Sequence, residues 1–263
     1  MPRHLWHNSL YRQWGRAETK PSPILMIAPL KSSPLRATKQ VYRGCLILFG
    51  ICLVLLSGLA VLAAEPATIS FSLDFPNSSP EHYSISVESA GRGHYESSGK
   101  ISADSEDRDT YQTDFQFSDE TRARIFELAA QAHYFSGKID SGNKKLAFTG
   151  AKKLAYQDGQ RSSTANYNFS PMPAVQQLTA LFQSVGATLE FGHRLSYFRR
   201  YQKLALDDEL KRMEDQARRG DLLELQAVRP VLQEIYDDTA VINVVRARAR
   251  RIVEMDHSPV PGK

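Results

Sequence analysis

Cysteine is almost absent from this chain of 263 residues, which has only Cys45 and Cys52, both in one apolar stretch. From residue 65 onward there is none, which excludes disulfides, cysteine nucleophiles and cysteine-ligated zinc from that part. The sequence also lacks the HExxH and H-x₃₋₅-H spacings of zinc sites, the GxSxG nucleophile elbow, a P-loop and a dinucleotide-binding fingerprint. We therefore predict no catalytic residue, no cofactor and no metal ligand.

Acidic residues are scarce in the first 43 residues, which carry eight Lys or Arg and a single Glu. Of the 33 basic and 29 acidic residues of the chain, 25 and 28 follow this leader. The overall net charge of +4 is thus a property of the leader, and the rest of the chain is slightly acidic. That balance argues against binding to nucleic acid. We interpret residues 1–43 as a basic, disordered leader.

Charge is missing altogether from residues 44–64, a run of 21 residues. As a helix this run would extend about 31 Å, close to the thickness of the hydrocarbon core of a bilayer. The excess of Lys and Arg before it predicts an N-terminus that stays in the cytoplasm. Everything after Ala64 is then exported across the cytoplasmic membrane.

The apolar run is either a cleaved signal peptide or a single transmembrane anchor. Its densest part, residues 45–56, has the length of a signal-peptide core, and the small residues at its end favour cleavage near Ala63 or Ala64. The long leader favours an anchor, unless Met26 is the true start. An uncleaved run would bind the membrane through residues 44–64, whereas cleavage would leave a periplasmic or secreted protein.

Alternation of apolar and polar residues predicts antiparallel strands in the first exported domain, residues 67–190. Four stretches alternate in this way: residues 68–75, 82–89, 94–98 and 111–117. A helix is then expected from the N-cap Ser118 to about Ser136, because apolar residues recur at helical spacing between them.

The second half of this domain contains a predicted hairpin. Residues 144–148 and 152–156 repeat each other as KKLAF and KKLAY, and we interpret both as strand pieces. The Asp158-Gly159 turn and the alternation that follows it give the strongest hairpin signal in the chain. The resulting order predicts an α+β fold, an antiparallel sheet of about five to six strands with one packed helix.

Two stretches carry a resemblance to known proteins. They are YSISVESAGRGHYESSG, residues 83–99, and FQFSDETRARIFELAAQAHYF, residues 115–135. They resemble small domains of an uncharacterised family of bacterial exported or membrane-anchored proteins. The shared positions are mostly core positions, so the resemblance implies a fold and no particular substrate.

Apolar residues at helical spacing predict an all-helical region over residues 191–256, followed by a tail, residues 257–263. The apolar stripe includes Phe198, Tyr201 and Leu204. Gly220-Asp221 marks a helix stop, and Pro230 is expected to delay or kink the next helix. The run ELQAVRPVLQEIYDDTAVINVVRARARRI loosely resembles one HEAT-type helical pair, which alone makes no extended binding surface.

Four polar clusters are candidates for chemistry, and each has a plainer interpretation. The acidic residues 104–109 lack the turn glycine of a calcium loop and are expected to form a solvated hairpin loop. His82 and His94 are expected to face each other across a hairpin. The run YFRRY, residues 197–201, can bind anionic polymers or lipid headgroups, but Phe198 and Tyr201 have core spacing. Asn77 begins a glycosylation sequon, which matters only in a eukaryotic secretory pathway.

Two functions follow as hypotheses. The first is an exported or membrane-tethered cell-envelope protein that acts by binding or structural interaction with a protein or envelope partner. The alternative is an envelope hydrolase whose carboxylates act with His82 or His94, which requires a pocket that gathers two or more of these groups.

Overall fold

The computed structural model describes residues 65–101 and 108–255. These residues fall within one compact unit, Ala63–Lys263. The sheet, the helices and the hydrophobic core of the described part all belong to this unit, so we expect it to fold without the residues that precede it. The leader, the start at Met26, the apolar run, cleavage near Ala63 or Ala64, and the tail lie outside the described residues.

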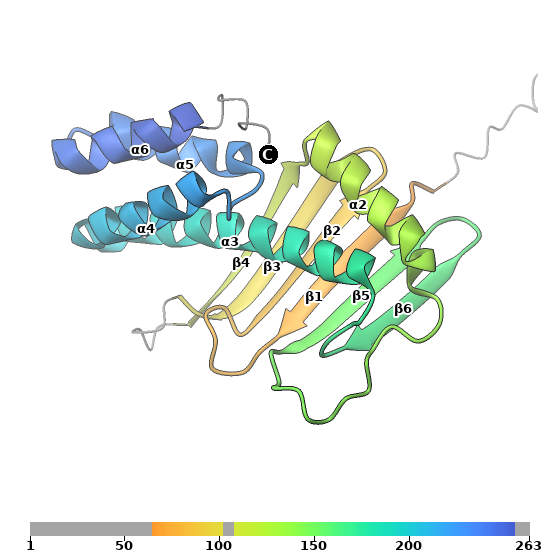
Figure 1. The fold of residues 1–263 in the computed structure, drawn as a ribbon. Coiled ribbons are helices and arrows are strands. Elements are labelled where there is room, and N and C mark those ends of the chain that lie inside the picture. The colour runs from red at the N-terminus through yellow and green to blue at the C-terminus, as the bar shows by residue number, and fades with distance from the viewer. Residues whose placement is uncertain (1–64, 102–107, 256–263) are drawn as a thin grey trace, which may run out of the picture. The chain divides into compact units, whose positions relative to one another are not determined.

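Six antiparallel strands form one sheet in the order β4-β3-β2-β1-β5-β6 (Figure 1). Their bounds are β1 Thr68–Asp74, β2 His82–Glu88, β3 Arg92–Lys100, β4 Arg108–Gln116, β5 Ala151–Gln157 and β6 Ser162–Tyr167. Residues of β2 alternate between the two faces: Tyr83, Ile85 and Val87 are buried, and the residues between them are partly exposed. The period-2 pattern thus defines an inner, apolar face and an outer, polar face.

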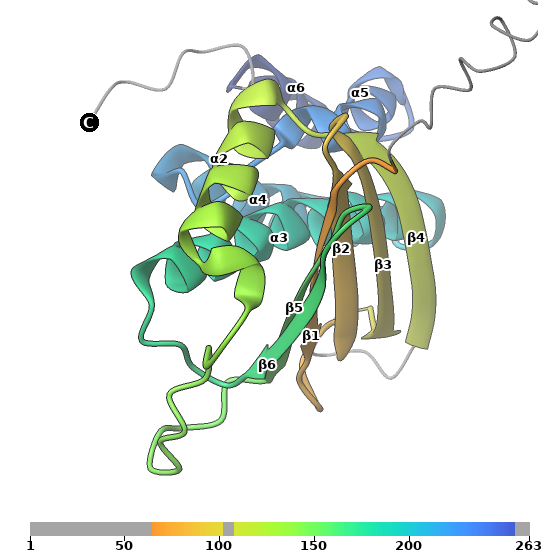
Figure 2. The same cartoon turned by 90° about the vertical axis from the view of Figure 1, so that its right-hand side faces the viewer.

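Two helices cross the inner face of the sheet, as Figures 1 and 2 show: α2, Asp119–Gln131, and α3, Pro173–Tyr201. Ser118 caps α2, because its Oγ accepts a hydrogen bond from the backbone N–H of Thr121. The Phe182 ring of α3 stacks on Phe71 of β1 with 5.4 Å between ring centroids. The core between the sheet and this helical layer continues into the C-terminal helices as one buried apolar cluster.

Two further helices pack against α3: α4, Leu206–Arg219, and α5, Arg229–Asp237. The last helix, α6, Asn243–Met255, packs against α4 and α5. Short 3₁₀ turns lie at His133–Phe135, Lys203–Ala205 and Leu225–Val228. Gly192 allows the last of these turns to approach closely, since a Cβ there would lie 2.5 Å from Cγ1 of Val228. Within the described residues, none of the helices has the length and apolar composition needed to span a bilayer.

The structure confirms the α+β fold with an antiparallel sheet and a C-terminal helical region, and it corrects three details. Two helices, α2 and α3, cover the sheet, not one. Residues 144–148 form a turn and a loop instead of a strand. Leu204 is 95% exposed and Tyr201 64% exposed, because α3 ends at Tyr201 and the helical stripe ends with it.

Buried glutamates connect the elements of the helical region. Glu214 of α4 accepts hydrogen bonds from Arg248 Nη1 at 2.7 Å and from Arg251 Nε at 2.8 Å, both on α6. Glu224 is also buried, and its carboxylate accepts hydrogen bonds from the backbone N–H and the hydroxyl of Ser118 at the start of α2. These carboxylates therefore join segments that are distant in the sequence.

We expect Glu214→Ala to lower the free energy of unfolding by about 3 kcal/mol, because it removes the buried carboxylate that pairs with both Arg248 and Arg251 of α6. Those hydrogen bonds, with burial opposing them, lower the pKa of Glu214 to about 2. A depressed pKa stabilises the fold above the ordinary value near 4.5, and that stability is lost as the pH falls toward 2. Urea unfolding at pH 7 and pH 3 measures both effects.

The matched control is Glu254→Ala, which removes an exposed carboxylate of α6 that pairs with Arg250 four residues earlier. This change should cost less than about 0.5 kcal/mol. Equal losses in the two variants would contradict the role given to Glu214.

Candidate functional site

A cleft of about 510 Å³ opens between the inner face of β4 and the C-terminal half of α3. Tyr111 from β4 lines one side, and His193, Tyr197 and Arg200 from α3 line the other. The alternation of β4 turns Tyr111 toward α3, and the helical periodicity of α3 brings residues 193, 197 and 200 to the same side. The site is thus built on two regular elements.

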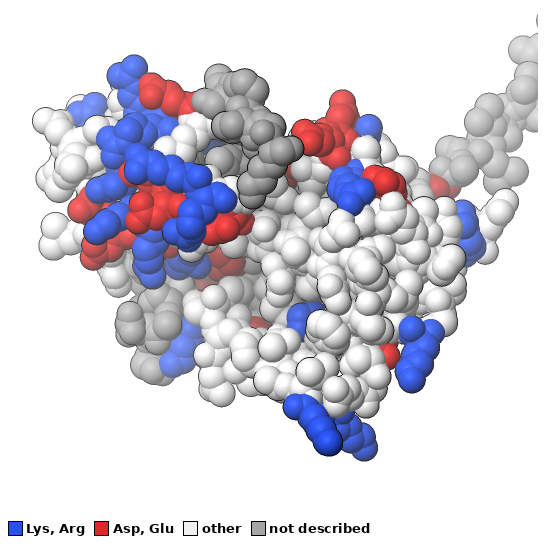
Figure 3. Space-filling view, viewed as in Figure 1, with Lys and Arg blue, Asp and Glu red and all other residues white. Residues whose placement is uncertain are grey.

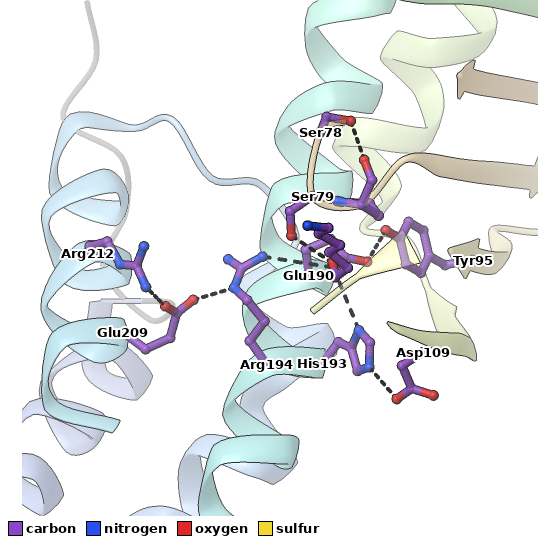
Figure 4. A network of polar contacts seen from close by, with 11 residues as sticks. Ser78, Ser79, Tyr95, Asp109, Glu190, His193, Arg194, Glu209 and Arg212 are labelled. Carbon is purple, nitrogen blue, oxygen red and sulfur yellow. Dashed lines mark hydrogen bonds and ion pairs between the residues drawn. The ribbon is translucent and has the colours of Figure 1, made fainter. Parts of the chain in front are cut away.

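His193 forms the floor of the cleft, and its side chain is only 10% exposed. Its ring stacks on Tyr111 with 4.3 Å between centroids and an interplanar angle of 5°. Nε2 lies 3.2 Å from Oδ2 of Asp109, and Nδ1 lies 3.7 Å from Oε2 of Glu190 (Figure 4). The imidazole is therefore held between two carboxylates and against an aromatic ring.

Glu190 connects this histidine to the sheet and to α4. The hydroxyl of Tyr95 on β3 donates a hydrogen bond of 2.5 Å to Oε1 of Glu190. Arg194 approaches Glu190 at 3.9 Å and donates from Nε to Glu209 of α4 at 2.6 Å. Figure 4 shows the resulting chain of contacts, which runs from β3 through α3 to α4.

Charges and hydrogen bonds within the network shift the pKa values of His193 and Glu190. Burial alone would lower the pKa of His193, but the carboxylates of Glu190 and Asp109 outweigh it and raise that pKa. For Glu190 the directions are reversed. Burial alone would raise its pKa, but hydrogen bonds from His193, Ser97 and Tyr95 outweigh burial and lower that pKa. Both shifts favour an imidazolium–carboxylate pair over the two neutral groups.

Aromatic and basic side chains surround the mouth of the cleft. Tyr197 and Tyr201 lie 5.0 Å apart between ring centroids, and Tyr201 is largely exposed. Arg108 donates two hydrogen bonds to the carboxylate of Glu81. Arg200 is exposed, its guanidinium lies 5.9 Å from the centroid of the Tyr201 ring, and it forms no ion pair with any residue that the structure describes.

The run YFRRY, residues 197–201, lies at this mouth, and only part of what its spacing predicted is confirmed. Phe198 is buried, as its spacing predicts, and Arg200 is exposed. Arg199 differs, because it pairs with Glu234 of α5 at 2.6 Å. The expectation that Tyr201 belongs to the core is wrong.

His82 and His94 lie on the outer face of the sheet, away from the cleft. Strand register places His82 opposite Ser98 and His94 opposite Ser86, so the expectation that the two histidines face each other is wrong. Each contacts its own aspartate through Nδ1 at 2.6 Å, His82 with Asp74 and His94 with Asp114.

The acidic cluster lies partly outside the described residues, since residues 102–107 are not among them. Its last member, Asp109, is described and contacts His193. Among residues 65–101 and 108–255, no three His, Cys, Asp or Glu side chains are placed to hold a metal ion. Asn77 lies in the turn that follows β1 and has a positive φ of 65°.

Sequence reasoning missed the central residues of this site. Glu190 and His193 carry only an i, i+3 spacing on a long helix, which is common on any amphipathic helix. Their partners Tyr95 and Asp109 lie 95 and 84 residues away. No local motif marks such a cluster.

Comparison with models of protein families and with curated proteins finds no match to the chain. The resemblance to a family of bacterial exported proteins therefore remains a prediction, as does the HEAT-like character of the C-terminal helices.

Removal of His193 should change how stability depends on pH. A raised pKa in the folded state means that the imidazolium stabilises the fold fully below about pH 6.5, and that this stability is lost as the pH rises through the folded pKa. We expect His193→Gln to cost about 1 to 2 kcal/mol at pH 6 and less at pH 9. Urea unfolding at the two pH values measures the difference.

His94→Gln is the matched control, because His94 also contacts an aspartate but is 45% exposed. Its cost at pH 6 should stay below about 1 kcal/mol. A loss for His193→Gln that is the same at pH 6 and pH 9 would show that the ring acts through packing alone.

Proposed function

We propose that this chain is an exported cell-envelope protein, tethered by residues 44–64 or released by cleavage, that binds a protein partner. The cleft between β4 and α3 is the binding site, and it accepts an acidic segment of that partner. The observation that carries the proposal is the exposed guanidinium of Arg200 beside the exposed ring of Tyr201, above a buried polar floor.

The residue types at the mouth support a protein partner. Tyrosine and arginine are enriched among the residues that contribute most to protein–protein binding, because they combine apolar area with hydrogen bonding. Tyr201 is 64% exposed, and the adjacent Tyr197 ring extends the same aromatic surface. Burial of these rings by a partner would remove apolar area from water.

The charge balance supports an acidic segment. Glu81 pairs with Arg108, Asp109 pairs with His193, and the carboxylate of Glu190 lies near both His193 and the guanidinium of Arg194. Within the described part of the lining, Arg200 then carries the remaining unpaired charge. A guanidinium forms two parallel hydrogen bonds with a carboxylate, which gives both affinity and orientation.

The network below the mouth supports binding through rigidity. Glu190 ties α3 to β3, and Arg194 ties it to α4, so the helix that carries Tyr197 and Arg200 is held on two sides. A site that is already ordered loses less conformational entropy when it binds.

The hydrolase alternative now depends on His193 instead of His82 or His94. It has one supporting observation, the histidine between two carboxylates at the floor of a cleft. Both ring nitrogens are directed at carboxylates, and the raised pKa favours the protonated ring, which is a poor general base. Binding is therefore the better supported function.

An acidic model peptide tests the cleft. We expect hexaglutamate to bind residues 65–263 and to shift the NMR signals of Tyr197 and Tyr201, whereas hexaglutamine should not. Arg200→Glu should weaken the affinity at least tenfold, because it replaces attraction by repulsion. Lys211→Glu on α4 is the matched control, since it makes the same change of charge at an exposed site outside the cleft. Equal weakening in both variants would show that only net charge matters.

N-terminal sequencing of the protein recovered from its native cells tests export. An N-terminus near Glu65 in a periplasmic or culture fraction would mean cleavage, and an intact leader in the membrane fraction would mean an anchor. Recovery of the chain in the cytoplasmic fraction with its leader intact would contradict both forms of the proposal.

A further inference from the structure

Four large apolar side chains are exposed together at one end of the sheet. Phe75 follows β1, Leu146 and Phe148 lie in the loop before β5, and Phe169 follows β6. Their exposed fractions are 37%, 39%, 56% and 43%. Figure 1 shows this loop projecting beyond the lower ends of the strands. We call these four residues, with Lys144 and Lys145, the tip.

Direct contacts connect parts of the tip. The rings of Phe75 and Phe148 meet edge to face with 6.0 Å between centroids. The side chain of Asn168 donates to the carbonyl of Ala147 at 3.0 Å and accepts from the backbone N–H of Thr149 at 3.0 Å. The loop is thereby held beside Phe169, and its apolar side chains are presented in a defined arrangement.

The charge around the tip is basic. Lys144 and Lys145 are exposed, and neither forms an ion pair within the part of the chain that the structure describes. The nearby carboxylate of Asp140 accepts hydrogen bonds from the backbone N–H groups of Gly142 and Asn168. Asp74 contacts His82. The lower end of the molecule in Figure 3 shows basic side chains without acidic ones beside them.

We propose that the tip binds the surface of a bilayer that contains anionic lipids. The aromatic and leucine side chains enter the interface between headgroups and acyl chains, and the two lysines contact lipid phosphates. An apolar surface bordered by two exposed lysines has the composition of an interfacial membrane-binding site. Exposed Phe and Leu on a loop are otherwise unfavourable in water.

This surface is separate from the site of the proposed function. The cleft lies between β4 and α3, whereas the tip is formed beside β1, β5 and β6. The tip also lies far from the first described residues of the chain. Thr68 begins β1, whereas Phe75 of the tip directly follows the other end of that strand. The two proposals therefore stand or fall independently.

Vesicle co-sedimentation tests the proposal on residues 65–263, the unit that contains the complete core. We expect binding to vesicles of phosphatidylglycerol and phosphatidylcholine, and little to phosphatidylcholine alone. Lys144→Gln with Lys145→Gln should weaken binding about 25-fold, since each lysine near an anionic surface contributes about fivefold. Phe148→Ser should weaken it about tenfold.

Two variants elsewhere serve as matched controls. Lys211→Glu changes the net charge by the same amount as the double lysine variant, and Leu204→Ser removes a side chain that is 95% exposed outside the tip. Neither should weaken binding more than about twofold.

Three outcomes would overturn the proposal. They are no binding to anionic vesicles at low salt, equal binding to both kinds of vesicle, and equal losses in the tip variants and the controls. If the unit instead forms a dimer that Phe148→Ser dissociates, the occupant of the tip is a second copy of the chain.

Discussion

Buried carboxylates that join distant elements are the constraint on which this structure depends. Glu190, Glu209, Glu214 and Glu224 are all buried, and each accepts hydrogen bonds from a different element. A buried carboxylate without a partner would cost several kcal/mol, so each contact determines where its partner element lies. The sheet and the C-terminal helices are therefore coupled through specific polar contacts as well as through apolar packing.

This coupling explains why the candidate site lies where sheet and helices meet. Glu190 serves two purposes, because it ties α3 to Tyr95 of the sheet and also faces the imidazole of His193. The same carboxylate thus stabilises the fold and sets the protonation of the cleft floor. Arg200 lies about two turns beyond His193 on α3, at the mouth of the cleft, and forms no ion pair within the described part of the chain.

Much of the sheet was predictable from the sequence, since period-2 alternation, the Ser118 cap and the Asp158-Gly159 turn are local signals. The error at residues 144–148 has a physical cause. They repeat the pattern of residues 152–156, and only the second copy occupies the place between β1 and β6. The local pattern does not determine which copy pairs, and the unpaired copy becomes an exposed loop.

The buried network was not predictable, because a glutamate on an amphipathic helix has the same local pattern whether it faces solvent or a guanidinium. Glu214 and its partners Arg248 and Arg251 are 34 and 37 residues apart, and their arginines resemble ordinary charges near a helix end. Only the tertiary structure brings such groups together. The sequence shows residue types that suit binding, such as the run from Tyr197 to Tyr201, but it does not determine which of their side chains are exposed.

Hydrogen exchange of the backbone amides tests the coupling most directly. If the carboxylates make one cooperative unit, the most protected amides of β2 and of α6 will exchange with the same free energy of opening, equal to that of global unfolding. If the amides of α4 to α6 exchange through openings several kcal/mol below those of the sheet, the helical region is an independent unit. The central role of the buried glutamates would then be contradicted.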